Sequence, residues 1–187
     1  MRITVNNHDN VHRTDYIPHR TVQRKRRWYA IVVDHVHREN IFAAGFSALT
    51  MLRKNFEVHI YAHCGGKEAL GRAPGQGVSP EAVAKLARLM GAEFFRSNIL
   101  GGYLVGGTNE EIESLINTMR APMKGIKDLV PALSGGLSPK NIGDNLRAFG
   151  TGFMALAGSG ITQYPGGIAA GVEAMKAAAT AAIGEKR

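Results

Sequence analysis

The chain has 187 residues, of which 44% are hydrophobic and 20% charged, and its formal net charge is +8 at pH 7. These values are typical of one globular domain with its own core. The sequence contains no apolar run of the roughly 20 residues that a membrane helix needs, and its first residues lack the apolar centre of a signal peptide. One cysteine, Cys64, excludes an intrachain disulfide and a cysteine-based zinc cluster, so we expect a cytoplasmic protein without membrane contact.

The positive charge is densest near the start of the sequence. Residues 1–39 hold eight Lys and Arg against four Asp and Glu, and residues 40–187 hold 15 against 11. The basic run 24–27 lies beside Trp28 and Tyr29. One alternative function is therefore a basic adaptor protein whose first 39 residues bind an acidic partner. Such runs usually belong to solvated surface, so nucleic-acid binding is not the function that we expect.

Residues 1–39 also differ in composition from the rest of the sequence. They contain no glycine and no leucine, but five of the seven histidines. Only residues 28–33 have the pattern of a strand. Two interpretations stay open: a basic leader followed by one strand, or a segment that is not native to the fold, produced by another reading frame or a misplaced start. We therefore divide the chain into residues 1–39 and residues 40–187.

From Asn40 onward, short apolar runs alternate with helical patterns. A loop of small residues at 43–45 precedes a helix at 46–54, and strands are predicted at 58–62, 93–96, 129–133 and 153–157. Helix starts are predicted at Ser79 and Ser138, each followed by proline, and at Thr108 with Glu111. An alanine-rich helix is predicted over 168–183. The pattern gives four strand–helix units from residue 58 and part of another before them.

Two glycine loops follow the last two predicted strands. Ser134, Gly135 and Gly136 follow the first, and Gly158, Ser159 and Gly160 follow the second. Small residues let backbone N–H groups approach an anion closely, and eight-stranded α/β barrels bind phosphate in the loops after strands seven and eight. We therefore predict a phosphate site at these loops, with simple tight turns as the alternative.

The predicted fold class is α/β, as the C-terminal half of a (β/α)8 TIM barrel with four to five βα units. Right-handed crossovers would make the strands parallel and neighbouring. A half sheet leaves edges exposed, so a homodimer or a missing N-terminal half would complete it.

Five stretches, in their order and spacing, resemble a known family. From Asn40 to about Ala179, the sequence resembles the C-terminal catalytic barrel of the RuBisCO large subunit, and it is closer to the RuBisCO-like proteins that do not fix carbon. The matching stretches are 44–48, 61–63, 83–89, 132–137, and 157–160 with Tyr164, Pro165 and 169–171.

The resemblance implies roles for particular residues. Ser134 to Gly136 and Gly158 to Gly160 would hold a substrate phosphate through their backbone. His63 falls at the family's active-site histidine after the fifth strand and would assist proton transfer. Arg96 falls where the family has a phosphate-facing histidine, and an arginine preserves a donor there.

Departures from the family pattern limit what the resemblance implies. Cys64 stands where the family usually has an arginine, so one phosphate contact is lost. Cys64 could be a nucleophile beside His63, although packing is the commoner role of such a cysteine. Tyr103 stands in the loop that carries the carboxylase's essential lysine, so we expect no CO2 fixation. The family's magnesium ligands would lie before Asn40, where nothing resembles them; no metal or cofactor site is assigned in this chain, and Mg²⁺ is implied only for the full-length family.

The resemblance implies a RuBisCO-like segment that binds a phosphorylated keto sugar. The parent enzyme would enolise, isomerise or decarboxylate this substrate, and we expect this chain to be inactive alone. The alternative is a non-catalytic half-barrel remnant that folds by pairing and at most binds sugar phosphates.

Overall fold

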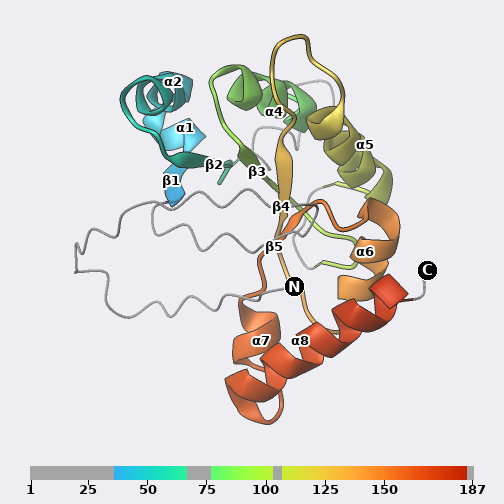
Figure 1. Ribbon diagram of the computed structural model, residues 1–187. Coiled ribbons are helices and arrows are strands. Elements are labelled where there is room, and N and C mark those ends of the chain that lie inside the picture. The colour runs from blue at the N-terminus through green and yellow to red at the C-terminus, as the bar shows by residue number, and fades with distance from the viewer. Residues whose placement is uncertain (1–35, 67–76, 103–106, 185–187) are drawn as a thin grey trace, which may run out of the picture.

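A parallel β-sheet organises the part of the chain that the structure describes. The structure is a computed structural model, and it describes residues 36–66, 77–102 and 107–184 (Figure 1). Five parallel strands follow one another in chain order: β1 (Val36–Asn40), β2 (His59–His63), β3 (Phe94–Ser97), β4 (Val130–Leu133) and β5 (Met154–Ala155). Within these residues β1 and β5 each pair on one side only, so the described sheet is open. The α/β class and the parallel neighbouring strands are confirmed, whereas closure into a barrel stays a prediction.

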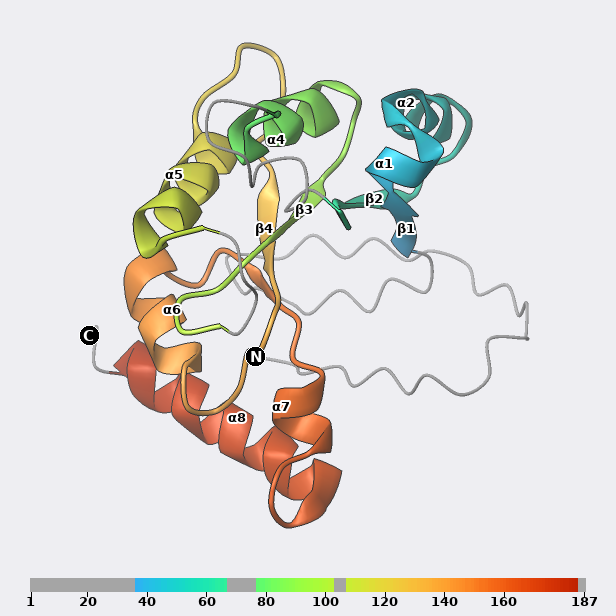
Figure 2. The same ribbon diagram turned by 180° about the vertical axis from the view of Figure 1, so that it is seen from behind.

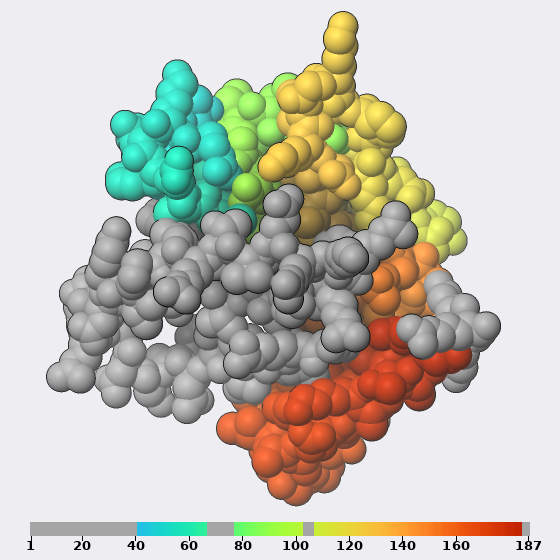
Figure 3. All heavy atoms as spheres, in the orientation of Figure 1, coloured from blue at the N-terminus to red at the C-terminus, as the bar shows by residue number. Residues whose placement is uncertain are grey.

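The helices lie in an arc along one side of the strands (Figures 1 and 2). They are α1 (Ile41–Ala44), α2 (Phe46–Asn55), α4 (Pro80–Leu89), α5 (Asn109–Arg120), α6 (Ile142–Phe149), α7 (Ser159–Thr162) and α8 (Gly167–Gly184). In the space-filling view, α7 and α8 form the lower part of the described molecule (Figure 3). None of the described helices is both long and apolar enough to cross a membrane.

The predicted caps fix the starts of two helices. The Ser79 hydroxyl accepts the N–H of Ala82 at 3.2 Å, with Pro80 as the first helical residue. Thr108 and Glu111 form the predicted capping box, in which each side chain accepts the other's backbone N–H.

Three predictions about elements are wrong or incomplete. Helix α6 begins at Ile142 rather than Ser138, because the side chain of Asn141 accepts the Ser138 N–H at 2.9 Å and holds residues 138–141 in a turn. Residues 41–44 form a helical turn instead of a loop. Strand β1 and helix α7 were not predicted. The strand predicted at 28–33 lies outside the described residues.

The two faces of the sheet differ in chemistry. Ile60, Ala62 and Phe95 are fully buried and belong to an apolar cluster with residues of α2, α4 and α5. Successive strand residues point to opposite faces. The residues of β2 and β3 that alternate with this buried set therefore lie on the second face, and they are polar and aromatic. On that second face the ring centroids of Tyr61 and His63 lie 6.0 Å apart. The helices therefore cover one face, and the other carries the ionisable groups.

The apolar core consists of two clusters. The first lies between β2, β3 and the helices α1, α2 and α4, and the second lies between β4, α6, α7 and α8. The largest fully buried side chains are shared between them, and they include Leu49, Ile60, Phe95, Ile116, Leu133, Ile142 and Met175. Both clusters lie against the helix-covered face, so they fix the strand ends on which the candidate site is built.

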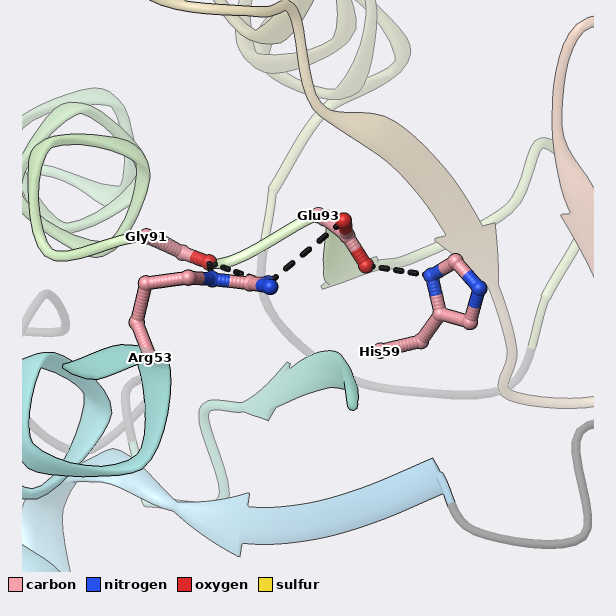
Figure 4. Close-up of polar contacts among 4 residues, drawn as sticks. All are labelled: Arg53, His59, Gly91 and Glu93. Atoms are coloured by element: carbon pink, nitrogen blue, oxygen red, sulfur yellow. Dashed lines mark hydrogen bonds and ion pairs between the residues drawn. The ribbon is translucent and has the colours of Figure 1, made fainter. Parts of the chain in front are cut away.

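Arginines near the ends of three helices hold the turns that lead into the next strands. Arg53 of α2 donates to the carbonyl of Gly91 and pairs with Glu93, whose carboxylate also contacts the Nδ1 of His59 (Figure 4). Arg88 of α4 donates to three carbonyls of the turn after α5, at 2.6–3.1 Å. Arg120 of α5 donates to the carbonyls of Phe149 and Gly152. His59 therefore has the structural role that its alternation with apolar residues suggests.

Candidate functional site

The residues predicted as a site all lie at the carboxyl ends of the strands. His63 ends β2, Arg96 lies in β3, and the two glycine loops follow β4 and β5. Parallel strands bring these ends to one edge of the sheet, where α/β proteins bind their ligands. The sheet order therefore places the predicted residues on four neighbouring strands.

The loop after β4 has a backbone shape that requires glycine. Gly135 has φ 104° and Gly136 has φ 99°, in the left-handed region that other residues rarely adopt. The N–H of Ser134 donates to the carbonyl of Ser97 at 3.1 Å, which ties the start of the loop to β3. Among the described residues, no acceptor contacts the N–H of Gly135 or Gly136. These donors are available to an anion.

The loop after β5 lies directly on the loop after β4. An ideal Cβ on Gly160 would come within 2.2 Å of the carbonyl oxygen of Leu137, so only glycine allows this approach. The carbonyl of Gly158 accepts the N–H groups of Ile161 and Thr162. In the described part of the chain, the N–H groups of Ser159 and Gly160 contact no acceptor. The two loops thus form one surface with four backbone donors.

Arg96 joins this surface from β3. Its side chain is 8% exposed, and its Nε donates to the hydroxyl of Ser134 at 3.2 Å. A guanidinium stays protonated at any physiological pH, so a fixed positive charge lies beside the loop after β4.

His63 lies two strands away from the loop after β4. Its Nδ1 accepts the backbone N–H of Gly65 at 3.2 Å. An imidazole nitrogen that accepts a hydrogen bond carries no proton, so the neutral ring holds its proton on Nε2. The Nε2–H of His63 can therefore donate a hydrogen bond to a substrate oxygen.

Cys64 is a packed residue rather than an exposed thiol. It is fully buried in the first apolar cluster, and its Sγ donates to the backbone carbonyl of Arg96 at 3.5 Å. Reactive cysteines occupy partly exposed, electropositive surroundings. The packing interpretation of Cys64 therefore holds, and the thiol links the ends of β2 and β3.

The described residues provide no donor set for a magnesium ion. Among them, no three His, Cys, Asp or Glu side chains lie close enough together to hold a metal. Tyr103, which stands in the loop after β3, lies outside the described residues.

Sequence reasoning missed two asparagines on α6. Asn145 is fully buried, and its side chain bonds both backbone groups of Leu100, in the loop after β3. Asn141 donates to the carbonyls of Gly101 and Gly136, one from each loop. The sequence did contain a signal for Asn145, a polar residue in the apolar stripe of α6 between Ile142 and Leu146. A buried amide needs hydrogen-bond partners, so its position indicates a structural bond to backbone.

Open parallel α/β sheets bind their ligands at the carboxyl edge, and this sheet carries its two glycine loops there. The family model that matches this chain is described as ribulose bisphosphate carboxylase large chain, catalytic domain, and the match covers residues 1–187. The chain belongs to this family, as its resemblance predicted.

Relatives that are named for different activities are similar to this chain in sequence. A ribulose bisphosphate carboxylase from Pyrococcus furiosus is 31% identical over 147 residues, which cover 77% of this chain and 35% of the relative. A 3-oxo-isoapionate-4-phosphate decarboxylase from Rhizobium etli is 29% identical over 149 residues, with the same coverage of 77% and 35%. The family therefore includes members that do not carboxylate.

A solved structure shares the fold as well. The octameric ribulose-1,5-bisphosphate carboxylase/oxygenase of Pyrococcus horikoshii superposes with a TM-score of 0.73 at 31% identity, covering 79% of this chain and 36% of that one. The chain thus spans about a third of the length of the relatives that it matches.

Proposed function

We propose that this chain binds a phosphorylated keto sugar at the carboxyl edge of its sheet. The observation that carries the proposal is the pair of contacting glycine loops, whose four N–H groups find no acceptor among the described residues. The N–H groups of Gly135, Gly136, Ser159 and Gly160 bind the phosphate, whereas the N–H of Ser134 is bonded to the carbonyl of Ser97 and fixes the start of the first loop. Arg96 adds a positive charge beside Ser134.

His63 acts on the sugar rather than on the phosphate. Its Nε2–H can donate a hydrogen bond to a substrate oxygen as negative charge develops there, and so assist proton transfer elsewhere on the sugar. One relative is named as a decarboxylase of a phosphorylated 3-oxo acid. This name supports a parent enzyme that enolises, isomerises or decarboxylates its substrate without fixing CO2.

The 187-residue chain by itself binds substrate but does not turn it over. Forming an enediolate requires a base and a group that stabilises the developing negative charge. Among the described residues, His63 is the acid–base side chain that we assign to this edge, and no group of three His, Cys, Asp or Glu side chains could hold a metal there. We further propose that the chain assembles as a homodimer, since its described sheet has two open edges.

A second candidate is a non-catalytic half-barrel remnant. The open sheet favours it, because a parallel sheet is ordinarily covered on both faces and closed or flanked at its edges. Such a remnant folds by pairing and binds sugar phosphates at the same glycine loops. The two candidates differ in whether the longer parent protein is an enzyme, and both expect this chain to bind sugar phosphates.

Binding is tested by titrating the chain with D-ribulose 1,5-bisphosphate while recording backbone amide chemical shifts, with D-ribulose as the unphosphorylated control. The amides of Gly135, Gly136, Ser159 and Gly160 should shift with the bisphosphate and not with ribulose. A titration without these shifts contradicts the proposal.

A matched pair of glycine variants locates the binding. Gly136→Ala forces an L side chain into a φ of 99°, and Gly125→Ala does the same at a φ of 76°, in the turn after α5. We expect Gly136→Ala to weaken binding of the bisphosphate by about tenfold or more, because the loop donors move. Gly125→Ala should leave it within about twofold.

A turnover experiment tests the inactivity proposed for this chain. The purified chain is incubated with D-ribulose 1,5-bisphosphate in deuterium oxide with added Mg²⁺, and incorporation of deuterium into the sugar is followed by proton NMR. Binding without exchange is the expected result and is compatible with both candidates. Exchange that His63→Ala abolishes would establish catalysis and refute the inactivity proposed for this chain.

A further inference from the structure

The side chain of Asn141 joins the two loops that flank the candidate phosphate site. Its Nδ2 donates to the carbonyl of Gly136 at 3.1 Å and to that of Gly101 at 3.3 Å. Its Oδ1 accepts the N–H of Ser138 at 2.9 Å. One amide group therefore bonds the loop after β3, the loop after β4 and the turn that leads into α6.

Asn145 holds Asn141 in place from the next turn of α6. Its Nδ2 donates to the backbone carbonyl of Asn141 at 2.9 Å and to that of Leu100 at 3.1 Å. Its Oδ1 accepts the N–H of Leu100 at 3.0 Å. Because these partners are backbone groups of known polarity, they fix which way each amide faces.

The loops also meet directly, without a side chain between them. An ideal Cβ on Gly102 would lie 2.6 Å from the carbonyl oxygen of Gly135. The carbonyl of Gly135 thus faces the loop after β3, and the carbonyl of Gly136 faces Asn141.

These two contacts decide where the neighbouring N–H groups point. In a trans peptide unit the C=O and the N–H of the next residue point in opposite directions. The N–H of Gly136 therefore points away from the loop after β3, and the N–H of Leu137 points away from Asn141. These N–H groups point away from Asn141 and from the loop after β3, because the carbonyls of the same peptide units are held toward them.

We propose that Asn141 is a positioning residue for the anion-binding loop after β4. It touches no ligand itself. Its bond to the carbonyl of Gly136 fixes the peptide plane that carries the N–H of Leu137. Its bond to Gly101 holds the loop against which the carbonyl of Gly135 lies, and this carbonyl shares a peptide plane with the phosphate donor N–H of Gly136. This inference rests on the proposed phosphate site and adds a residue outside the glycine loops on which the site's affinity depends.

The test compares two variants of Asn141 with one control. Asn141→Ala removes the donor and the acceptor, and Asn141→Asp keeps the acceptor for Ser138 while it removes the donor to both loop carbonyls. The control is Asn55→Asp, which makes the same change in an exposed amide that donates to the carbonyl of Met51 at 2.7 Å. Each full-length variant is titrated with D-ribulose 1,5-bisphosphate and melted separately.

We expect the dissociation constant to rise about tenfold in both Asn141 variants and to stay within about twofold in Asn55→Asp. The amide shifts of Gly136 and Leu137 should also change in ligand-free Asn141→Ala, which a loss of stability alone does not cause. A weakening in Asn141→Asp only would be charge repulsion, and it would overturn the inference. Lower melting temperatures with unchanged affinity would overturn it as well.

Failure of the proposed phosphate site gives a different result. The unmodified chain then shows no amide shift with the bisphosphate, and the ligand-free spectra decide the role of Asn141. If the Gly136 and Leu137 amides move in Asn141→Ala, Asn141 positions a loop that binds another ligand. If they stay in place, the positioning role is wrong.

Discussion

Single buried arginines stabilise the edge of the sheet opposite the candidate site. Arg88 is 3% exposed, and its guanidinium donates to the carbonyls of Ala121, Ile126 and Lys127. A buried charge is tolerated when its donors are satisfied, and a planar guanidinium can bond several carbonyls at once. Arg120 is similar: burial lowers its pKa, and the nearby Asp128 opposes that shift. These arginines contribute to the stability of the fold and not to the candidate site.

Replacing Arg88 by methionine should destabilise the chain by about 3 kcal/mol. Methionine fills the same space but leaves three carbonyls without a donor, and the lost bonds are charge-assisted. Urea unfolding measures the change. Lys176→Met is the control, because it removes an exposed ion pair with Glu173 and should cost no more than about 0.5 kcal/mol. Equal losses in both variants would contradict the assigned role of Arg88.

At the residue scale, glycine placement was the strongest signal in the sequence. Gly135, Gly136 and Gly160 stand out because each follows a strand pattern, and the structure gives them the conformation or close approach that requires glycine. Arg88 and Asn141 gave no such signal. The partners of Arg88 are carbonyls 33–39 positions away, and one partner of Asn141, the carbonyl of Gly101, is 40 positions away. Because every residue has a backbone carbonyl, the sequence does not mark which of them will be a partner.

At the element scale, helix starts that carry their own caps were predictable and the others were not. Ser79 and Thr108 bond N–H groups three residues ahead, so the sequence alone contains the interaction. The start of α6 depends instead on Asn141, whose side chain is also bonded to two other loops. Strand β1 is defined by its pairing with β2, which local sequence cannot express.

The first turn of α5 gives a pH-dependent prediction. A hydrogen bond from Thr108 lowers the pKa of Glu110, so this carboxylate stabilises the folded state above its unfolded pKa. That contribution is lost as the pH falls through the folded pKa. We expect Thr108→Val to remove the N-cap at a cost of about 1 kcal/mol at pH 7, and to cost less at pH 3, where a larger fraction of Glu110 is protonated.

Urea unfolding at the two pH values measures this difference. Thr118→Val, in the same helix, is the control and should change stability by less than about 0.5 kcal/mol at either pH. A cost for Thr108→Val that stays the same from pH 7 to pH 3 would show that the Glu110 carboxylate does not take part.

The contact between the two glycine loops gives a prediction about packing. A methyl group at Gly160 would lie 2.2 Å from the carbonyl oxygen of Leu137 and 2.9 Å from Ser138. Gly160→Ala should therefore destabilise the chain by about 2 kcal/mol, since backbone must move to relieve the overlap. Gly152→Ala is the matched control, because its nearest contact is an ordinary 3.6 Å. Thermal and urea unfolding measure both, and equal effects would refute the close approach.

At the scale of the whole molecule, helices cover one face of the sheet, and within the described residues the edge strands β1 and β5 each pair on one side only. The helices bury Ile60, Phe95 and Leu133 on one side. Edge strand β5 has only two residues, and its register with β4 is Ala132 to Met154 and Leu133 to Ala155. The N–H of Leu156 donates to the carbonyl of Leu133 in β4. Because backbone groups alternate along a strand, those of Ala155 face the open side.

Self-association should therefore occur through the β5 edge. Sedimentation equilibrium should give a mass near twice the 20.1 kDa of one chain, and the melting temperature should rise with protein concentration if pairing stabilises the fold. Ala155→Pro removes an outward N–H and should shift the mass toward one chain. Leu89→Ser, at a 54% exposed leucine on α4, should leave the dimer intact. A dimer lost in Leu89→Ser but kept in Ala155→Pro would place the interface on the helices, and a monomer at every concentration would refute pairing altogether.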